Sequence, residues 1–158
     1  MASQASANPG VSDLERLVAL EDIRRLKARY FRCIDTRDWP GFTDCFAPDA
    51  VMDVSGEPER LIKDERGVYR GAVAIGAWGA RAAAGIQTRH HILMPEIDLT
   101  SATTASGIWA IEDRFWWPAG GPHRTLHGLG YEYETYSKIA GAWKIQTSRF
   151  QRLRTEYT

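Results

Sequence analysis

The sequence has no excess of charge of either sign, because 20 lysine and arginine residues balance 20 aspartate and glutamate residues. Nucleic-acid and anionic-membrane binders carry clustered positive charge, so neither partner is expected. No stretch approaches the roughly 18 uninterrupted apolar residues of a membrane-spanning helix. The two cysteines, Cys33 and Cys45, form no disulfide framework, and the first ten residues lack the basic and apolar stretches of a signal peptide. A cytoplasmic location is therefore expected.

The motifs of several large enzyme classes are also missing. There is no glycine-rich dinucleotide or phosphate loop, no GxSxG nucleophile and no HExxH or HxH pair. His90 and His91 lie in a segment of alternating pattern, and neighbours on a strand point to opposite faces, so they cannot easily share one metal ion. The sequence thus predicts neither a metal site nor a cofactor.

Length and composition indicate one ordinary globular domain. The 158 residues are enough to bury a core without disulfide or metal support, and the apolar share of 44% is close to the globular average. Residues 1–10 are small and polar, which predicts a disordered tail before a single domain at 11–158. Six tryptophans and six tyrosines indicate an aromatic core or an aromatic pocket.

The N-terminal half of the chain predicts helices. Ser12 and Glu15 have the spacing of a capping box, and apolar residues follow at helical spacing from Asp13 to about Asp35. Lys27 falls inside this apolar arc, where we expect its stem to lie along apolar surface and its amine to reach solvent. The next predicted elements are a helix at 41–46, a strand at 50–54, a polar loop at 56–66 and a helix at 72–84.

After residue 85 the apolar period changes to two, the period of a half-buried strand. We predict strands over residues 87–99, 103–117, 124–137 and 142–153. Helices followed by a run of strands predict an α+β fold, with an antiparallel-rich sheet and helices on one face.

Two of these strands carry ionisable residues on rows that look buried. His90 lies on the mostly apolar row of its strand. Asp113 is the only charged member of a row that includes Trp109 and Phe115. An unpaired charge there would cost several kcal/mol, so Asp113 must be paired, protonated or at the mouth of a cavity. The structural alternative is an ion pair with Arg149.

Tyr30 and Asp35 are the candidates on the first helix. Asp35 lies near the helix C-terminus, where the helix dipole disfavours a negative charge, and its alternative role is that of a turn former. Tyr30 lies one turn earlier in the apolar arc and would ordinarily be a core residue. Together with His90 they are more specific, because an imidazole oriented by a carboxylate is a neutral general base.

A third strand contributes a weaker candidate. His127 shares an alternating row with Leu129, Tyr131 and Tyr133, which makes this row a candidate pocket wall. The alternative is that His127 faces solvent near the end of its strand.

An ordered series of short segments resembles the SnoaL-like branch of the nuclear transport factor two-like superfamily, in particular the scytalone dehydratase and bile-acid 7-alpha-dehydratase type. The segments are Ala19-Leu20-Glu21-Asp22-Ile23 leading to Arg29-Tyr30, Asp35-Thr36-Arg37-Asp38-Trp39, Phe46-Ala47-Pro48-Asp49-Ala50, Gly71-Ala72-Val73-Ala74-Ile75, Thr88-Arg89-His90-His91 and Gly141-Ala142-Trp143-Lys144-Ile145.

The resemblance implies a cone-shaped α+β barrel with a deep apolar pocket, usually assembled as a dimer or trimer. It also implies the catalytic residues Tyr30, Asp35, His90 and Asp113. The histidine removes a proton next to a carbonyl, the first-helix aspartate holds its ring, the tyrosine assists at the oxygen, and water leaves.

We therefore expect a cofactor-free dehydratase acting on a small hydrophobic steroid-, terpenoid- or polyketide-like substrate. The expected substrate-binding residues are Trp109, Phe115, His127 and Tyr131. An isomerase or cyclase using the same base is one alternative. A non-catalytic binding or assembly domain, with Asp35 and His90 paired inside a core, is the other. The aromatic content makes a homodimer or homotrimer the expected assembly.

Overall fold

A computed structural model describes residues 10–57 and 67–158, so the predicted tail, except Gly10, and most of the predicted loop at 56–66 lie outside the described residues. The helices are α1 (Asp13–Thr36), α2 (Trp39–Asp44) and α3 (Ala72–Ala82). The strands are β1 (Phe46–Asp53), β2 (Val68–Arg70), β3 (Gln87–Ile92), β4 (Glu96–Leu99), β5 (Thr104–Trp116), β6 (Thr125–Ile139) and β7 (Ala142–Tyr157).

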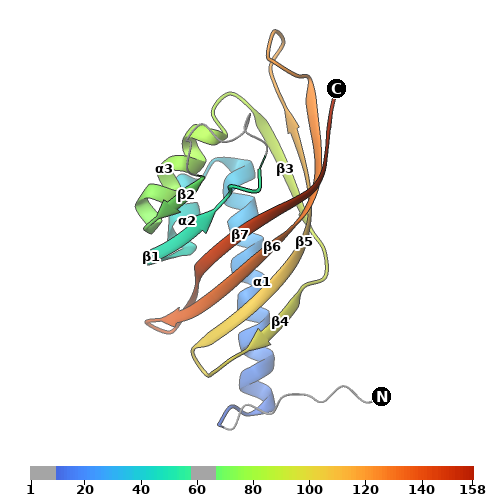
Figure 1. The fold of residues 1–158 in the computed structure, drawn as a ribbon. Coiled ribbons are helices and arrows are strands. Elements are labelled where there is room, and N and C mark those ends of the chain that lie inside the picture. The colour runs from blue at the N-terminus through green and yellow to red at the C-terminus, as the bar shows by residue number, and fades with distance from the viewer. Residues whose placement is uncertain (1–9, 58–66) are drawn as a thin grey trace, which may run out of the picture.

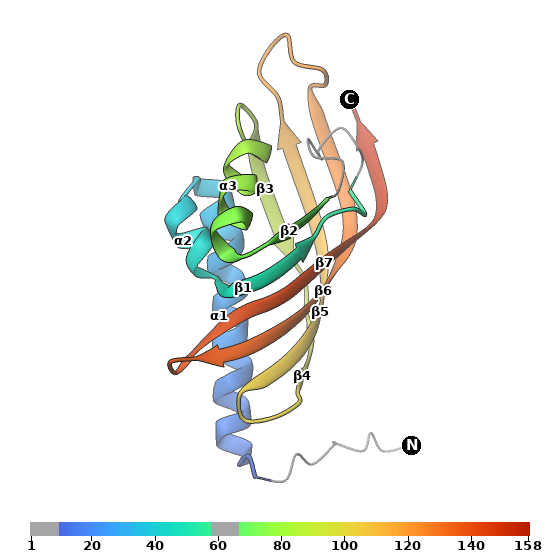
Figure 2. The ribbon, with the colours of Figure 1, turned by 60° about the vertical axis from the view of Figure 1, so that its left-hand side comes forward.

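The strands form one curved, open sheet of seven strands in the order β2-β1-β7-β6-β5-β3, with β4 also pairing with β5. Neighbours are antiparallel except β1 and β7, which are parallel. Figures 1 and 2 show α1 running along one face of the sheet, with α2 and α3 grouped near the C-terminal end of α1. This is the cone-shaped α+β fold, and the predicted fold class is confirmed.

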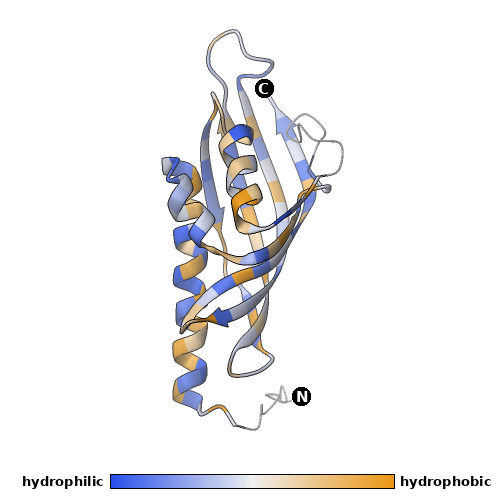
Figure 3. Cartoon of the chain, turned by 90° about the vertical axis from the view of Figure 1, so that its left-hand side faces the viewer, coloured by the Kyte–Doolittle hydropathy of each residue, from blue (hydrophilic) through white to orange (hydrophobic). Residues whose placement is uncertain are grey.

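Helix α1 begins and ends with regular caps. Ser12 accepts a hydrogen bond from the Glu15 amide at 3.3 Å, and the Glu15 carboxylate accepts one from the Ser12 amide at 2.8 Å, which is the predicted capping box. At the other end Arg37 adopts a left-handed conformation with φ of 61°, and its N–H bonds to the carbonyls of the last turn. Hydrophilic and apolar residues alternate in stripes along α1, whereas α3 is mostly apolar (Figure 3).

Lys27 lies at the centre of the α1–sheet contact, and the expectation that its amine reaches solvent is wrong. The residue is fully buried. Its Nζ donates to Glu134 Oε1 at 2.7 Å and to Glu132 Oε2, both on the inner face of β6. The apolar arc of α1 packs on this face, so the lysine meets carboxylates there instead of water. Buried ions need such partners, because taking a charge out of water costs several kcal/mol.

The predicted strand over 87–99 is also corrected. It is two strands, β3 and β4, separated by Leu93, Met94 and Pro95, and both pair with β5. Proline has no backbone N–H to donate to the strand ladder, which favours a break at this position. The other predicted helices and strands match observed elements, although their ends differ by several residues in β1 and β7.

Within residues 10–57 and 67–158, no helix is both long and apolar enough to cross a bilayer.

We expect Lys27→Met to lower the free energy of unfolding by about 3–5 kcal/mol, because it leaves Glu132 and Glu134 as unpaired buried charges. The matched control is Arg25→Met on the same helix. The Arg25 side chain is 78% exposed in its pair with Glu21, so the control should cost less than about 1 kcal/mol. Urea unfolding measures both. Equal small losses would contradict a stabilising role for the buried lysine.

Candidate active site

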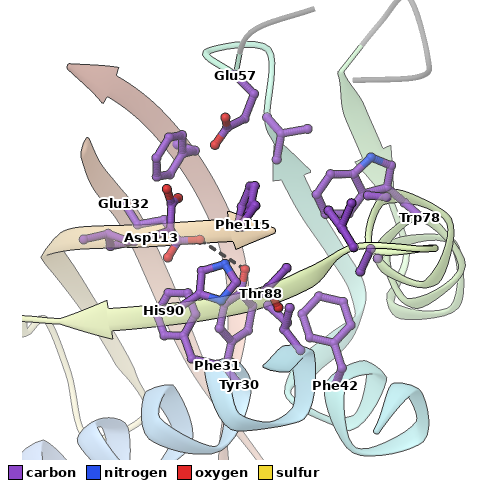
Figure 4. A pocket seen from close by; sticks show the side chains of 18 residues that line it. Tyr30, Phe31, Phe42, Glu57, Trp78, Thr88, His90, Asp113, Phe115 and Glu132 are labelled. Atoms are coloured by element: carbon purple, nitrogen blue, oxygen red, sulfur yellow. Dashed lines mark hydrogen bonds between the residues drawn. The ribbon is translucent and has the colours of Figure 1, made fainter. Parts of the chain in front are cut away.

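A cavity of about 110 Å³ lies between the helices and the inner face of the sheet. Most of its wall is apolar, with Phe31 and Ile34 from α1, Trp78 from α3, and Ile111 and Phe115 from β5. Its polar wall consists of Tyr30, Glu57, Thr88, His90, Asp113 and Glu132. In Figure 4 these side chains converge on one space from α1, β3, β5, β6 and the segment that follows β1.

Asp35 and His90 are in direct contact. Asp35 Oδ1 lies 2.7 Å from His90 Nδ1, and Asp35 Oδ2 accepts the His90 backbone N–H at 3.1 Å. Thr88 donates its hydroxyl to Asp35 Oδ1 at 3.0 Å, and the Arg89 guanidinium lies 3.7 Å from Oδ2. The last turn of α1 meets β3 here, so the carboxylate is held from several directions.

This geometry determines the tautomer of His90. An ionised carboxylate only accepts hydrogen bonds, so Nδ1 carries the proton and a neutral ring keeps its lone pair on Nε2. The ring stacks on Phe31 with a centroid distance of 4.9 Å and meets Phe115 edge-on at 5.6 Å. His90 is thus a fixed imidazole on the wall of an apolar cavity, which is the arrangement of a general base.

Asp113 lies opposite His90 in the pairing of β3 with β5 and is 3% exposed. Its Oδ1 accepts a hydrogen bond from Arg152 Nη1 at 2.9 Å, so the structural alternative named the wrong arginine. Arg149 instead lies over the Tyr133 ring at 4.8 Å. The register of β7 shifts at irregularities in its pairing with β6. An extra residue reverses which side chains face inward, so Arg152 points in and Arg149 does not.

Arg152 also holds Glu57. Its Nη2 donates to both carboxylate oxygens of Glu57 at 2.8 Å. Burial raises the pKa of Glu57 to about 7, although Arg152 opposes the shift. Gly128 leaves the room for this arrangement, because a Cβ at that position would collide with Arg152 and with Asp113 Oδ1.

Tyr30 contacts the buried cluster of Lys27, Glu132 and Glu134. Its hydroxyl donates to Glu132 Oε1 at 3.2 Å, and Ser148 donates to the same oxygen at 3.0 Å. The dashed line in Figure 4 marks the bond from Tyr30 to Glu132. Burial, followed by the nearby glutamates, raises the pKa of Tyr30 well above its ordinary value, so its phenol stays protonated.

Of the four residues predicted to bind substrate, Phe115 lines the cavity and the other three do not. Trp109 is buried in the core, with Nε1 donating to the Tyr136 hydroxyl at 2.6 Å. His127 bonds to Glu112 at 2.8 Å, and Tyr131 is 37% exposed. Both belong to the row of β6 that faces away from the helices, which corrects the prediction of a pocket wall there.

The inner row of β6 contributes buried carboxylates that were not among the candidates from the sequence. Glu132 lines the cavity, and Glu134 is buried beside it in the row. The signal for their burial is Lys27, a charge within an apolar helical arc that requires a buried anion. Among the described residues, no three His, Cys, Asp or Glu side chains are grouped so as to hold a metal ion.

The fold and the pocket define an α+β cone with an internal, mostly apolar cavity. A family model described as a SnoaL-like domain matches residues 15–149, and the chain belongs to that family. The resemblance inferred from the sequence is confirmed.

Solved structures show the same fold at low sequence identity. A hexachlorocyclohexane dehydrochlorinase, LinA type 2, has a TM-score of 0.80 at 17% identity, covering 93% of each chain. A protein assigned as a scytalone dehydratase from Novosphingobium aromaticivorans has a TM-score of 0.80 at 18% identity, covering 93% of this chain and 92% of that one. Rv3472 from Mycobacterium tuberculosis, of unknown function, has a TM-score of 0.72 at 24% identity, covering 89% and 75%.

We expect Glu134→Gln to remove a pH-dependent part of the stability. Burial raises the pKa of Glu134 from 4.5 to about 7, so the folded protein keeps a proton that the unfolded chain releases at lower pH. This contribution is complete below pH 4.5 and is lost as the pH rises to about 7. Between these two pH values, the free energy of unfolding of the wild type should fall by roughly 1–3 kcal/mol relative to that of the variant. Urea unfolding across the pH range measures the difference. The exposed Glu96→Gln change is the control, and a pH-independent difference between wild type and Glu134→Gln would contradict the expectation.

Proposed function

We propose that the protein is a cofactor-free lyase that eliminates water from a small hydrophobic substrate, with His90 as the general base. The observation that carries the proposal is the 2.7 Å contact between Asp35 and His90, on the wall of a mostly apolar cavity. A positioned base of this kind contributes about 10² to 10⁴ in rate. The similarity in fold to a dehydrochlorinase and to a protein assigned as a dehydratase is consistent with elimination chemistry.

The proposed reaction needs no further reactant. His90 Nε2 takes a proton from the carbon next to a carbonyl, and the electron pair of that C–H bond forms an enolate. Asp35 stabilises the resulting imidazolium. The enolate then expels the hydroxyl from the neighbouring carbon to form a C=C bond, and the imidazolium returns its proton so that water leaves. Tyr30, protonated at neutral pH, donates to Glu132 in the free protein, and in the proposed reaction its hydroxyl turns to the carbonyl oxygen and donates there as charge develops.

Cavity size favours a compact substrate. A cavity of about 150 Å³ holds benzene, so the 110 Å³ found here is close to the space for a single ring. Among the expected classes, this favours a small terpenoid or single-ring polyketide over a steroid.

The same small volume supports one competing proposal. Ligand sites usually exceed about 300 Å³, and a smaller cavity is compatible with a binding or assembly domain in which Asp35 and His90 form a structural pair. An isomerase or cyclase would use the same base without loss of water. Product mass separates these cases: loss of one water indicates the lyase, unchanged mass indicates the isomerase or cyclase, and no product indicates the binding domain.

We also propose a homodimer or homotrimer. Trp116, Leu129 and Tyr131, each 37–38% exposed, lie on strands β5 and β6, and pairing copies through this sheet would cover them. Sedimentation equilibrium should show two or three chains per particle. A particle of one chain at micromolar concentration would contradict the assembly.

We expect His90→Gln to lower turnover by roughly a hundredfold or more, because it removes the base while keeping a side chain of similar size. His91→Gln is the matched control, since His91 is exposed on the opposite face of the same strand. Turnover is followed by mass spectrometry on a panel of small β-hydroxy ketones. Equal turnover in the two variants, both folded by circular dichroism, would exclude His90 as the base.

A further inference from the structure

The polar wall of the cavity is composed largely of carboxylates. Glu57, Asp113 and Glu132 line it, from the segment after β1, from β5 and from β6. No lysine or arginine of the described residues lines it with them. Figure 4 shows the three carboxylates around one space, on the side opposite Phe42 and Trp78.

The matching cations lie behind these carboxylates. The Arg152 side chain is 6% exposed and is bonded to Glu57 and Asp113. The Lys27 side chain is fully buried and is bonded to Glu132 and Glu134. Each of these cations is shared between two carboxylates, so a ligand in the cavity meets the anionic side of both clusters.

Most hydrogen-bond donors on the cavity wall are already in use, and the exception within the described part of the chain is the Trp78 indole N–H on the α3 side, which has no partner. The Tyr30 hydroxyl donates to Glu132, the Thr88 hydroxyl donates to Asp35, and His90 Nδ1 donates to Asp35. The capacity that remains for a ligand is mainly that of acceptors: carboxylate oxygens and the Nε2 lone pair of His90. A carboxylate or phosphate ester would bring a full negative charge against these oxygens in a medium of low dielectric constant, whereas a hydroxyl or an amine can donate to them.

We propose that this cavity selects neutral or cationic ligands that carry hydroxyl or amine donors, and rejects carboxylates and phosphate esters. The inference rests on the proposed function only in that both use the same cavity. It restricts the substrate to an uncharged hydroxylated molecule or a protonated amine, and it makes an acyl phosphate or a free carboxylic acid unsuitable.

Glu57 is the residue that sets this selectivity most directly. It occupies Nη2 of Arg152, whose Nε has no hydrogen-bond partner. Above a pH of about 7, the pKa to which burial raises Glu57, this carboxyl is ionised, so at pH 8 Glu57→Gln removes one negative charge from the wall and weakens the hold on Arg152. An anionic ligand should then bind more tightly, because the repulsion is lower and because the Arg152 guanidinium has free N–H groups that can donate to it.

Three single-ring probes of matched size test the proposal: benzyl alcohol, benzylammonium and benzoate. Binding is measured by titration in protein-observed NMR, with the resonances of His90 and Phe115 reporting on the cavity. In the wild type we expect benzyl alcohol and benzylammonium to bind at least about tenfold more tightly than benzoate. Benzoate binding as tight as that of benzyl alcohol would overturn the proposal, as would the absence of cavity shifts with all three probes at millimolar concentration.

The variant experiment addresses Glu57 separately. In Glu57→Gln we expect benzoate affinity to rise by about fivefold or more and benzyl alcohol affinity to change by less than about twofold. Exposed Glu96→Gln is the charge-matched control. Unchanged benzoate affinity in a folded Glu57→Gln variant would overturn its role, and if that variant does not fold, Asp113→Asn replaces it. His90→Gln separates this proposal from the catalytic one, because it should abolish turnover and retain the order of probe affinities.

Discussion

The contact between Lys27 and the two glutamates of β6 fixes how α1 lies on the sheet. A fully buried amine with two carboxylate partners allows little rotation of the helix, because any shift would separate buried charges from their partners. Residues three, four, seven and eight positions further along a helix share its face. Tyr30, Phe31, Ile34 and Asp35 occupy those positions after Lys27, and each of them lines the cavity or bonds to a residue that does.

Two local features of the sheet complete the cavity. The irregular pairing of β7 with β6 brings Arg152 inward, and Gly128 leaves space for its contact with Asp113. The result is a pair of charge clusters along one side of an apolar space. The Lys27 cluster supports Tyr30, and the Arg152 cluster orients Asp113 and Glu57. The Asp35–His90 pair has its own anchors, Thr88 and the β3 backbone, so the base does not depend on either cluster for orientation.

The fold class and most helices and strands could be predicted from the sequence, because capping, helical spacing and period-two alternation are local properties. It also singled out Tyr30, Asp35, His90 and Asp113, of which Tyr30, His90 and Asp113 line one cavity and Asp35 is hydrogen-bonded to His90. It failed where the answer depended on distant partners. Lys27 was expected to reach solvent along its apolar stem, because its partners Glu132 and Glu134 are far away in sequence, and alternation alone did not show which row of β6 faces the helices. Arg149 was named as the partner of Asp113 because strict alternation places it on one row with Trp143 and Ile145, and the register shift in β7 leaves no pattern in the composition of the strand.

The most direct test of a base oriented by Asp35 is the position of the proton on His90, which ¹⁵N NMR of the imidazole reports without a substrate. At a pH where the ring is neutral, we predict a proton on Nδ1 and a bare Nε2, and we predict that Asp35→Asn weakens this preference. A proton on Nε2 in the wild type would place the lone pair toward Asp35 instead of the cavity. That result would contradict proton abstraction by His90.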